Sequence, residues 1–195
     1  MNYDLADVEV NGQDILSFMD ALTHFKMIGA QILQNEKIGT LVNGEYQIIP
    51  TEWYPLTDKI KILEQVKTRV GPKTLVNVGK KIPENAVFPP EIDSIHKAIA
   101  AINVAYHMNH RKAGKLMYDM ATQQITDGIG YYGYEAVSGE NKIISVCENP
   151  NLSEYDEGIV TAMAKKFQPF AQVTLDSSKP TRRNGDDNCT FLITW

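Results

Sequence analysis

Three of the four histidines fall in one predicted helix, which spans residues 91–110. His107 and His110 are three residues apart, and side chains at this spacing are neighbours on a helix surface. They could therefore bind one metal ion together. A catalytic zinc needs a third protein ligand and an open position, and the carboxylate spacing of a His-Glu-x-x-His motif is missing. We therefore expect His96, His107 and His110 to lie at the edge of the core. Metal or haem ligation by His107 or His110, or pH sensing, are the alternatives.

The two cysteines, Cys147 and Cys189, both fall in predicted strands. A strand cysteine that faces a core usually behaves as a small hydrophobic residue, and we expect this for both. Cys189 could share a zinc site with His110 in three dimensions, although no spacing supports one. So few cysteines in a chain of this length are typical of a cytosolic protein.

Sequence motifs of the common enzyme classes are missing. There is neither a Gly-x-Ser-x-Gly nucleophile motif nor a phosphate-binding Walker loop. The run from Gly128 to Gly133 has the letters Gly-x-Gly-x-x-Gly, but it precedes a predicted strand instead of joining a strand to a helix. We interpret it as a glycine-rich turn, and we do not expect a dinucleotide site.

The clustered charges have structural explanations. Asp156 and Glu157 fall in the first turn of a predicted helix, where negative charge complements the helix dipole. Basic residues gather in two places that we interpret as solvated loops: Lys179, Arg182 and Arg183, and His110, Arg111, Lys112 and Lys115.

Aromatic and methionine side chains concentrate where the predicted helices give way to strands. Such side chains could line an apolar ligand cavity with a few polar tips, or they could fill a core, which we favour. They are Trp53, Tyr54, Tyr106, Met108, Met117, Tyr118, Met120, Tyr131, Tyr132 and Tyr134.

The N-terminal two-thirds of the chain has the apolar periodicity of helices. We predict helices over residues 13–35, 57–70, 73–81 and 91–110, with a hairpin around Asn43–Gly44 in between. The first helix is capped by Asp14 and interrupted at Gly29–Ala30. It either packs on the domain or pairs with a second copy of the chain.

The C-terminal third changes to alternating strand patterns. A hairpin over residues 130–137 and 142–148 is followed by a helix at 153–167 and by strands at 171–176 and 189–195. This segregation predicts an α+β fold, with an N-terminal helical layer packed on a C-terminal antiparallel sheet of about four strands. We expect one compact domain, in which residues 1–40 form a helical arm that could serve dimerisation and residues 41–195 form the α+β part.

Composition limits the class of protein. The chain has 195 residues and a net charge of −5, which argues against nucleic-acid binding. The N-terminus lacks the basic start and apolar run of a secretory signal, and no apolar stretch approaches the length of a membrane span. We therefore expect a cytoplasmic protein.

Several short motifs resemble the small-ligand sensor domains of the 4-vinyl-reductase type, which share a fold with haem nitric-oxide-binding-like domains and with trafficking-complex subunits. The resemblance covers residues 50–195. It rests on Tyr54–Leu56, Gly71–Pro72, Val78–Gly79, Asn149–Pro150, Asp156–Val160 and the ending from Arg182 to Trp195, in which a basic residue, Gly185, Asp186, Cys189 and Phe191 recur.

This resemblance implies a domain that reads a small molecule and passes its state to a partner protein, often as a homodimer. Many relatives hold zinc through cysteines near this C-terminus, but only Cys189 matches here. The Tyr-x-Ser-x-Arg signature of the haem-binding branch is absent too. Haem and zinc therefore lack a complete motif in this chain.

We expect a cytosolic sensor or signalling-associated domain that binds a small apolar or haem-like ligand. The candidate lining residues are Tyr106, His107, His110, Met117 and Tyr118. Catalysis is the less favoured interpretation, and it takes the form of a metal-dependent enzyme that uses His107 and His110. A structural adaptor with a filled core is the third.

Overall fold

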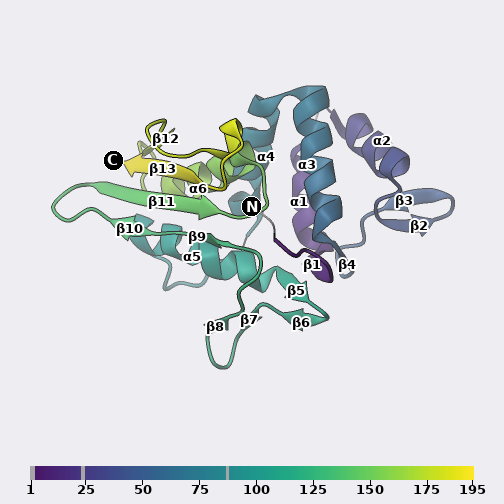
Figure 1. The fold of residues 1–195 in the computed structure, drawn as a ribbon, viewed down its shortest axis with the longest axis horizontal. Coiled ribbons are helices and arrows are strands. Elements are labelled where there is room, and N and C mark those ends of the chain that lie inside the picture. The colour runs from purple at the N-terminus through teal and green to yellow at the C-terminus, as the bar shows by residue number, and fades with distance from the viewer. Residues whose placement is uncertain (1–2, 23–24, 87) are drawn as a thin grey trace.

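The computed structural model describes residues 3–22, 25–86 and 88–195. Within these residues, six α-helices pack with two larger antiparallel sheets (Figure 1). Helices α1 to α3 lie at one end of the molecule, and the sheet that holds the C-terminal strand lies at the other. This arrangement confirms the predicted α+β class.

The predicted helix over residues 13–35 is two helices, α1 (Gly12–Ala21) and α2 (Lys26–Glu36); residues 23 and 24 lie outside the described residues. At the end of α1, the backbone N–H of Leu22 donates to the carbonyl oxygens of Met19 and Asp20. The predicted interruption at Gly29 is wrong: Gly29 is helical and lies against the Met19 side chain of α1.

The α1 N-cap differs from the predicted one. The side chain of Asn11 accepts a hydrogen bond from the backbone N–H of Asp14 at 2.8 Å. Because the Asn11 side chain caps the helix, the Asp14 carboxylate is not needed as the cap and can form other contacts.

Helices α3 (Leu56–Val70) and α4 (Pro72–Asn85) follow, separated by Gly71 at a φ of +102°. Helix α4 continues beyond the predicted limit at residue 81 and includes Pro83. On α3, Lys59 is buried, whereas Ile60 next to it is only half-buried.

Helix α4 makes its most extensive contact with α6 (Ser153–Phe167). The two backbones touch at a pair of glycines, where a Cβ on Gly79 would lie 2.1 Å from the carbonyl oxygen of Tyr155. A Cβ on Gly158 would lie 2.2 Å from that of Val76. Only glycine permits this approach, so no side chain separates the α4 and α6 backbones where they cross.

Helix α5 (Ile95–Met108) is capped by Ser94 and is shorter than predicted. His110 lies beyond its end, at the start of strand β5 (His110–Lys112). Strand β5 pairs with β1 (Val8–Asn11) in a sheet ordered β4–β1–β5–β6, completed by β4 (Trp53–Pro55) and β6 (Lys115–Leu116). This sheet, whose strands are far apart in the sequence, was not predicted.

The C-terminal sheet has the order β10–β11–β13–β12, and β9 also pairs with β11. Its central strands are β11 (Lys142–Glu148) and β13 (Cys189–Thr194), and the others are β9 (Tyr131–Tyr132), β10 (Glu135–Ala136) and β12 (Gln172–Leu175). Helices α5 and α6 lie behind this sheet in Figure 1.

Smaller elements complete the fold. The predicted hairpin at Asn43–Gly44 is confirmed by β2 (Thr40–Val42) and β3 (Glu45–Gln47), and β7 (Tyr118–Asp119) pairs with β8 (Gln124–Ile125). A 3-10 turn, η2 (Arg182–Asn184), precedes β13. No helix in the described ranges is both long and apolar enough to cross a membrane.

Candidate functional site

A small cavity of about 70 Å³, open to solvent on one side, lies among α1, α3, α5 and α6, with Ile82 of α4 at its edge. Exposed Ala105 and half-buried Ile82 and Asn109 mark its rim. The full lining consists of Asp14, Lys59, Ile82, Ile102, Ala105, Tyr106, Asn109, His110, Tyr132, Asn151, Tyr155 and Ile159.

Four of the lining side chains carry a buried polar atom that receives no hydrogen bond from any described residue. These atoms are Oδ2 of Asp14, Nε2 of His110, Oδ1 of Asn151 and Oη of Tyr155. Buried polar atoms in native proteins are nearly always hydrogen-bonded to protein or to ordered water. Asp14 Oδ2 is paired with Lys59 Nζ, so the other three atoms around one cavity indicate a site shaped to be filled by something polar.

An ion pair forms one wall of the cavity. Lys59 Nζ lies 2.5 Å from Asp14 Oδ2, and both side chains are largely buried. The contact brings the charges together without hydrogen-bond geometry at Oδ2. Lys59 Nζ also lies 5.0 Å above the ring of Tyr155, where a cation is attracted to the aromatic face. The two charges cancel, so this wall carries no net charge.

His110 is neutral at the cavity wall. Its Nδ1 lies 2.6 Å from the carbonyl oxygen of Tyr106, which can only accept, so Nδ1 carries the proton and donates. Burial, reinforced by the charge of Lys59, lowers the pKa of His110 to about 3. Its Nε2 is therefore a bare acceptor.

Tyr155 and Asn151 bring polar atoms from α6 and the segment before it. Tyr155 is almost fully buried, and burial raises the pKa of its hydroxyl well above the ordinary value, with the charge of Asp14 adding to the effect. Asn151 donates from Nδ2 to the hydroxyl oxygen of Tyr132 at 3.2 Å.

A buried network continues from Tyr132 to Asp156, which is fully buried. The Tyr132 hydroxyl donates to Asp156 Oδ1 at 2.5 Å, and Asn149 and Arg182 donate to its Oδ2 at 3.1 and 2.5 Å. The same Arg182 guanidinium also donates to the backbone carbonyls of Asn149 and Asn151.

The interpretation of Arg182 as part of a solvated loop is therefore wrong. Its side chain is only 12% exposed. Burial alone would lower the pKa of Arg182, but the charge of Asp156 and the hydrogen bond to it outweigh burial and raise this pKa. Sequence could not show this, because the partner carboxylate lies 26 residues away.

The predicted burial of both cysteines is confirmed, and both are free thiols. They lie directly opposite each other on β11 and β13. Cys189 contacts the hydroxyls of Ser153 and Thr181 and the N–H of Arg182. Burial alone would raise the pKa of the Cys189 thiol, but these hydrogen bonds lower it.

The structure brings two of the five predicted lining residues to the cavity, Tyr106 and His110, whose ring centroids are 4.5 Å apart. His107 is buried too, but its Nδ1 bonds to the Asn103 carbonyl, and it lies near Asp127 and Gly130. Met117 is buried in the core, and Tyr118 is half-buried in the β7–β8 hairpin.

The candidate metal ligands His107, His110 and Cys189 do not form one cluster. Among the residues that the structure describes, no group of three or more histidine, cysteine, aspartate or glutamate side chains could hold a metal ion. His96 bonds through Nδ1 to the hydroxyl of Tyr134 at 2.8 Å, away from the other two.

Sequence reasoning missed five polar residues of this cavity: Asp14, Lys59, Asn109, Asn151 and Tyr155. One signal was available, because Lys59 lies three, four and seven residues before the buried Ile62, Leu63 and Val66 and so shares their face. A lysine on a buried helix face is rare unless it is paired. Asn151 carried no local signal.

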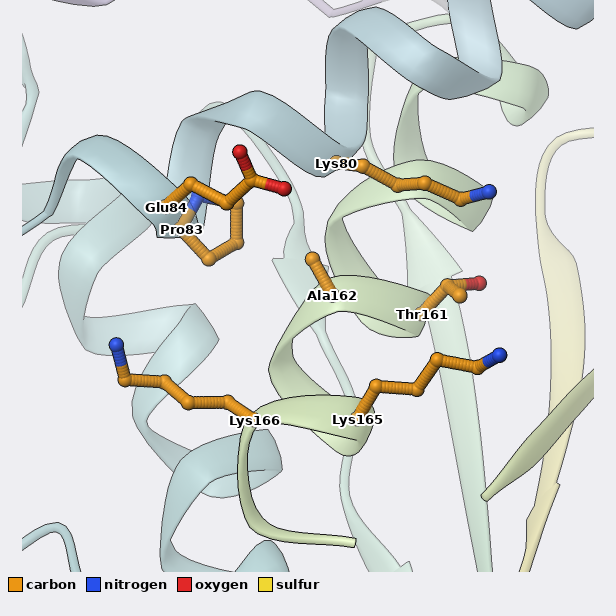
Figure 2. Close-up of a pocket in the computed structure, with 7 residues that line it drawn as sticks. All are labelled: Lys80, Pro83, Glu84, Thr161, Ala162, Lys165 and Lys166. Atoms are coloured by element: carbon orange, nitrogen blue, oxygen red, sulfur yellow. The ribbon is translucent and has the colours of Figure 1, made fainter. Parts of the chain in front are cut away.

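A second pocket, of about 340 Å³, lies on the outer side of the α4–α6 pair (Figure 2). Lys80 and Lys165 extend to the same side, whereas Lys166 extends the opposite way. The lysines Lys165 and Lys166 are exposed, and none of the buried polar atoms described above lines this pocket. The cavity of about 70 Å³ is therefore the better candidate site.

No protein-family model matches the chain, and neither does any curated protein. Solved structures of H-NOX proteins do share its fold. The H-NOX protein from S. oneidensis in the Fe(II)NO ligation state matches with a TM-score of 0.63 at 13% identity, over 94% of this chain and 97% of that one. The Fe(II) unliganded H-NOX protein from K. algicida matches with a TM-score of 0.59 at 14% identity, over 94% and 95%. The fold of the predicted haem nitric-oxide-binding-like relatives is thereby confirmed.

Proposed function

We propose that this chain is a cytoplasmic small-ligand sensor domain, which binds its ligand in the cavity between α1, α3, α5 and α6 and signals through a partner protein. Three buried polar atoms without a hydrogen-bond partner, on the lining residues His110, Asn151 and Tyr155, carry the proposal. Shared fold with H-NOX proteins supports it, as does the presence of two free buried thiols, which suits a reducing compartment.

The residues present do not fit a haem. His110 offers a suitable acceptor nitrogen, but the cavity of about 70 Å³ is far below the roughly 300 Å³ or more that larger ligands occupy. The backbone contact between Gly79 and Gly158 holds α4 against α6, and Arg182 is already bound to Asp156. We therefore propose a ligand much smaller than haem, and more polar than the apolar ligand expected from sequence.

Cavity size limits the ligand and its affinity. A water molecule takes about 30 Å³ of liquid, so the cavity corresponds to roughly two waters or one molecule of three or four heavy atoms. The best small ligands gain about 1.5 kcal/mol per heavy atom. The dissociation constant is then no tighter than tens of micromolar, on the order expected for −6 kcal/mol.

The buried network offers a route from the cavity to the surface. Asn151 lines the cavity, bonds to Tyr132, and shares Arg182 with Asp156 through its carbonyl. Arg183, the residue after Arg182, is paired with Glu157 at the surface. We propose that the η2 turn, which holds both arginines, is where the partner protein reads the state of the cavity. Homodimerisation through α1 and α2 stays a prediction.

Thermal unfolding in the presence of small probes tests this function. Formamide and acetamide are added at several millimolar to the full chain, alongside haemin in a separate titration. At one hundred times the dissociation constant the gain is about 2.7 kcal/mol, which raises Tm by several degrees for a chain of this size. We expect such a rise with at least one probe and no stoichiometric haemin complex.

A matched pair of variants locates the effect. Ala105→Leu adds a larger side chain at the cavity rim, whereas Ala100→Leu makes the same change on an exposed part of α5 away from the cavity. The Tm rise should disappear in the first and persist in the second. A stoichiometric haemin complex, or no probe response in the wild type, would contradict the proposed function.

A further inference from the structure

The hydrogen-bonding capacity of the cavity wall can be assigned atom by atom. Tyr132 donates its only hydroxyl proton to the Asp156 carboxylate at 2.5 Å, so its oxygen has only lone pairs left for Asn151. Asn151 must therefore present Nδ2 to Tyr132, which fixes its amide orientation. Its Oδ1 is left as an acceptor without a donor among the described residues.

His110 supplies a second acceptor by the same reasoning. The Tyr106 carbonyl can only accept, so the proton of the neutral ring is on Nδ1 and the lone pair is on Nε2. The Tyr155 hydroxyl is the third unpartnered group, and it can donate to a ligand as well as accept. All three side chains are at least 97% buried.

The charge of the wall selects against ions. Lys59 and Asp14 neutralise each other at 2.5 Å, and the imidazole of His110 carries no charge. An ion entering this site would lose its hydration without meeting an opposite charge that is free to pair with it, which is costly in a buried environment. An uncharged molecule avoids that cost.

From this wall we propose that the ligand is a small uncharged molecule with two N–H or O–H donors and one acceptor, of the primary amide or urea class. The donors bind Nε2 of His110 and Oδ1 of Asn151, and the acceptor receives the Tyr155 hydroxyl. This inference rests on the proposed function, because it specifies the ligand of the same cavity.

Probes of one shape separate the chemical classes. Acetamide, acetone and acetate each have four heavy atoms in a planar fork, and they differ in donors and charge. Binding to the full chain is measured by NMR titration of the backbone amides of His110, Asn151 and Tyr155. We expect saturable shifts with acetamide, and at least tenfold weaker binding of acetone and of acetate.

One variant tests the Tyr155 contact without threatening the fold. Tyr155→Phe removes a hydroxyl that has no hydrogen-bond partner among the described residues, so the folded state should be at least as stable as the wild type. It should weaken acetamide binding about tenfold. Tyr118→Phe makes the same change in the β7–β8 hairpin, outside the cavity, and should leave binding unchanged.

The outcomes separate this inference from the function on which it rests. Acetone or acetate binding within threefold of acetamide, or unchanged acetamide binding in Tyr155→Phe, would overturn the ligand class and leave a small-ligand site standing. If no probe, including formamide, gives a saturable shift, the cavity holds ordered water only, and both the ligand class and the sensor function are overturned.

Discussion

The His110 imidazole stays neutral because burial disfavours its charged form, and the positive charge of Lys59 adds to this effect. The unfolded chain takes up a proton on this residue near pH 6.5, whereas the folded chain does not until about pH 3. Over this interval the unfolded state binds more protons, so stability falls as the pH drops.

The pH dependence of His110→Gln measures this effect. From pH 7 to pH 4 the wild type should lose about 3 kcal/mol more stability than the variant. Between pH 7 and pH 9 the difference between them should stay constant. Urea unfolding at each pH gives both free energies, and parallel curves below pH 6.5 would show that His110 is protonated in the folded state.

A substitution of Asp156 tests the buried network, again at the scale of single residues. Asp156→Asn leaves the Arg182 guanidinium, 12% exposed, without its carboxylate. Removing one partner of a buried ion pair costs about 3–5 kcal/mol, and we expect a loss of this size in the free energy of unfolding.

Glu157→Gln is the matched control one residue further along α6. Glu157 pairs with Arg183, but both side chains are about a third exposed, and such pairs contribute about 1 kcal/mol or less. Equal losses for the two variants would show that the Asp156–Arg182 pair is not desolvated as the structure has it.

At the scale of elements, the α4–α6 crossing depends on two glycines that let the helix backbones touch. Gly158→Ala would place a Cβ 2.2 Å from the Val76 carbonyl oxygen and 2.8 Å from Gly79 Cα. These are backbone atoms, which cannot turn away, so the helices must separate. We expect a loss of about 3 kcal/mol or more in thermal or urea unfolding.

Gly29→Ala is the comparison for a helical glycine. Its new Cβ would meet the ends of the Met19 and Leu22 side chains, which can rotate away, and alanine favours the helix by about 0.5–1 kcal/mol. A net change within about 1 kcal/mol is expected. A loss as large as that of Gly158→Ala would indicate that helix interiors here are rigid in general, and that the crossing is not special.

At the scale of the whole molecule, α1 contributes to the same core as the C-terminal sheet. Phe18 on α1 is 2% exposed, whereas Phe170, after α6, is 94% exposed. Phe18→Ala should therefore cost about 3–5 kcal/mol, and Phe170→Ala less than about 0.5 kcal/mol. A small effect of Phe18→Ala in calorimetry would mean that the N-terminal helices form a detachable arm.

Much of the fold follows from local sequence. The seam of α5, with Ile95, Ile99 and Ile102 three and four residues apart, predicts a helix because periodicity is a local property. The β2–β3 turn follows from Asn43–Gly44, since these residues accept positive φ. The errors lie at boundaries and pairings: β1 pairs with β5, about a hundred residues away, and no local pattern encodes such a partner.

The candidate site divides in the same way. The sequence by itself predicted Tyr106 and His110 as lining residues, because residue types and their spacing along an apolar helix can be read from the sequence. Only the tertiary structure decided that His110 faces Asp14, Lys59, Asn151 and Tyr155, and that His107 does not. The physical reason is that a side chain's polar partners depend on which helices pack together, and here the packing brings residues of α1, α3, α5 and α6 to one cavity of about 70 Å³.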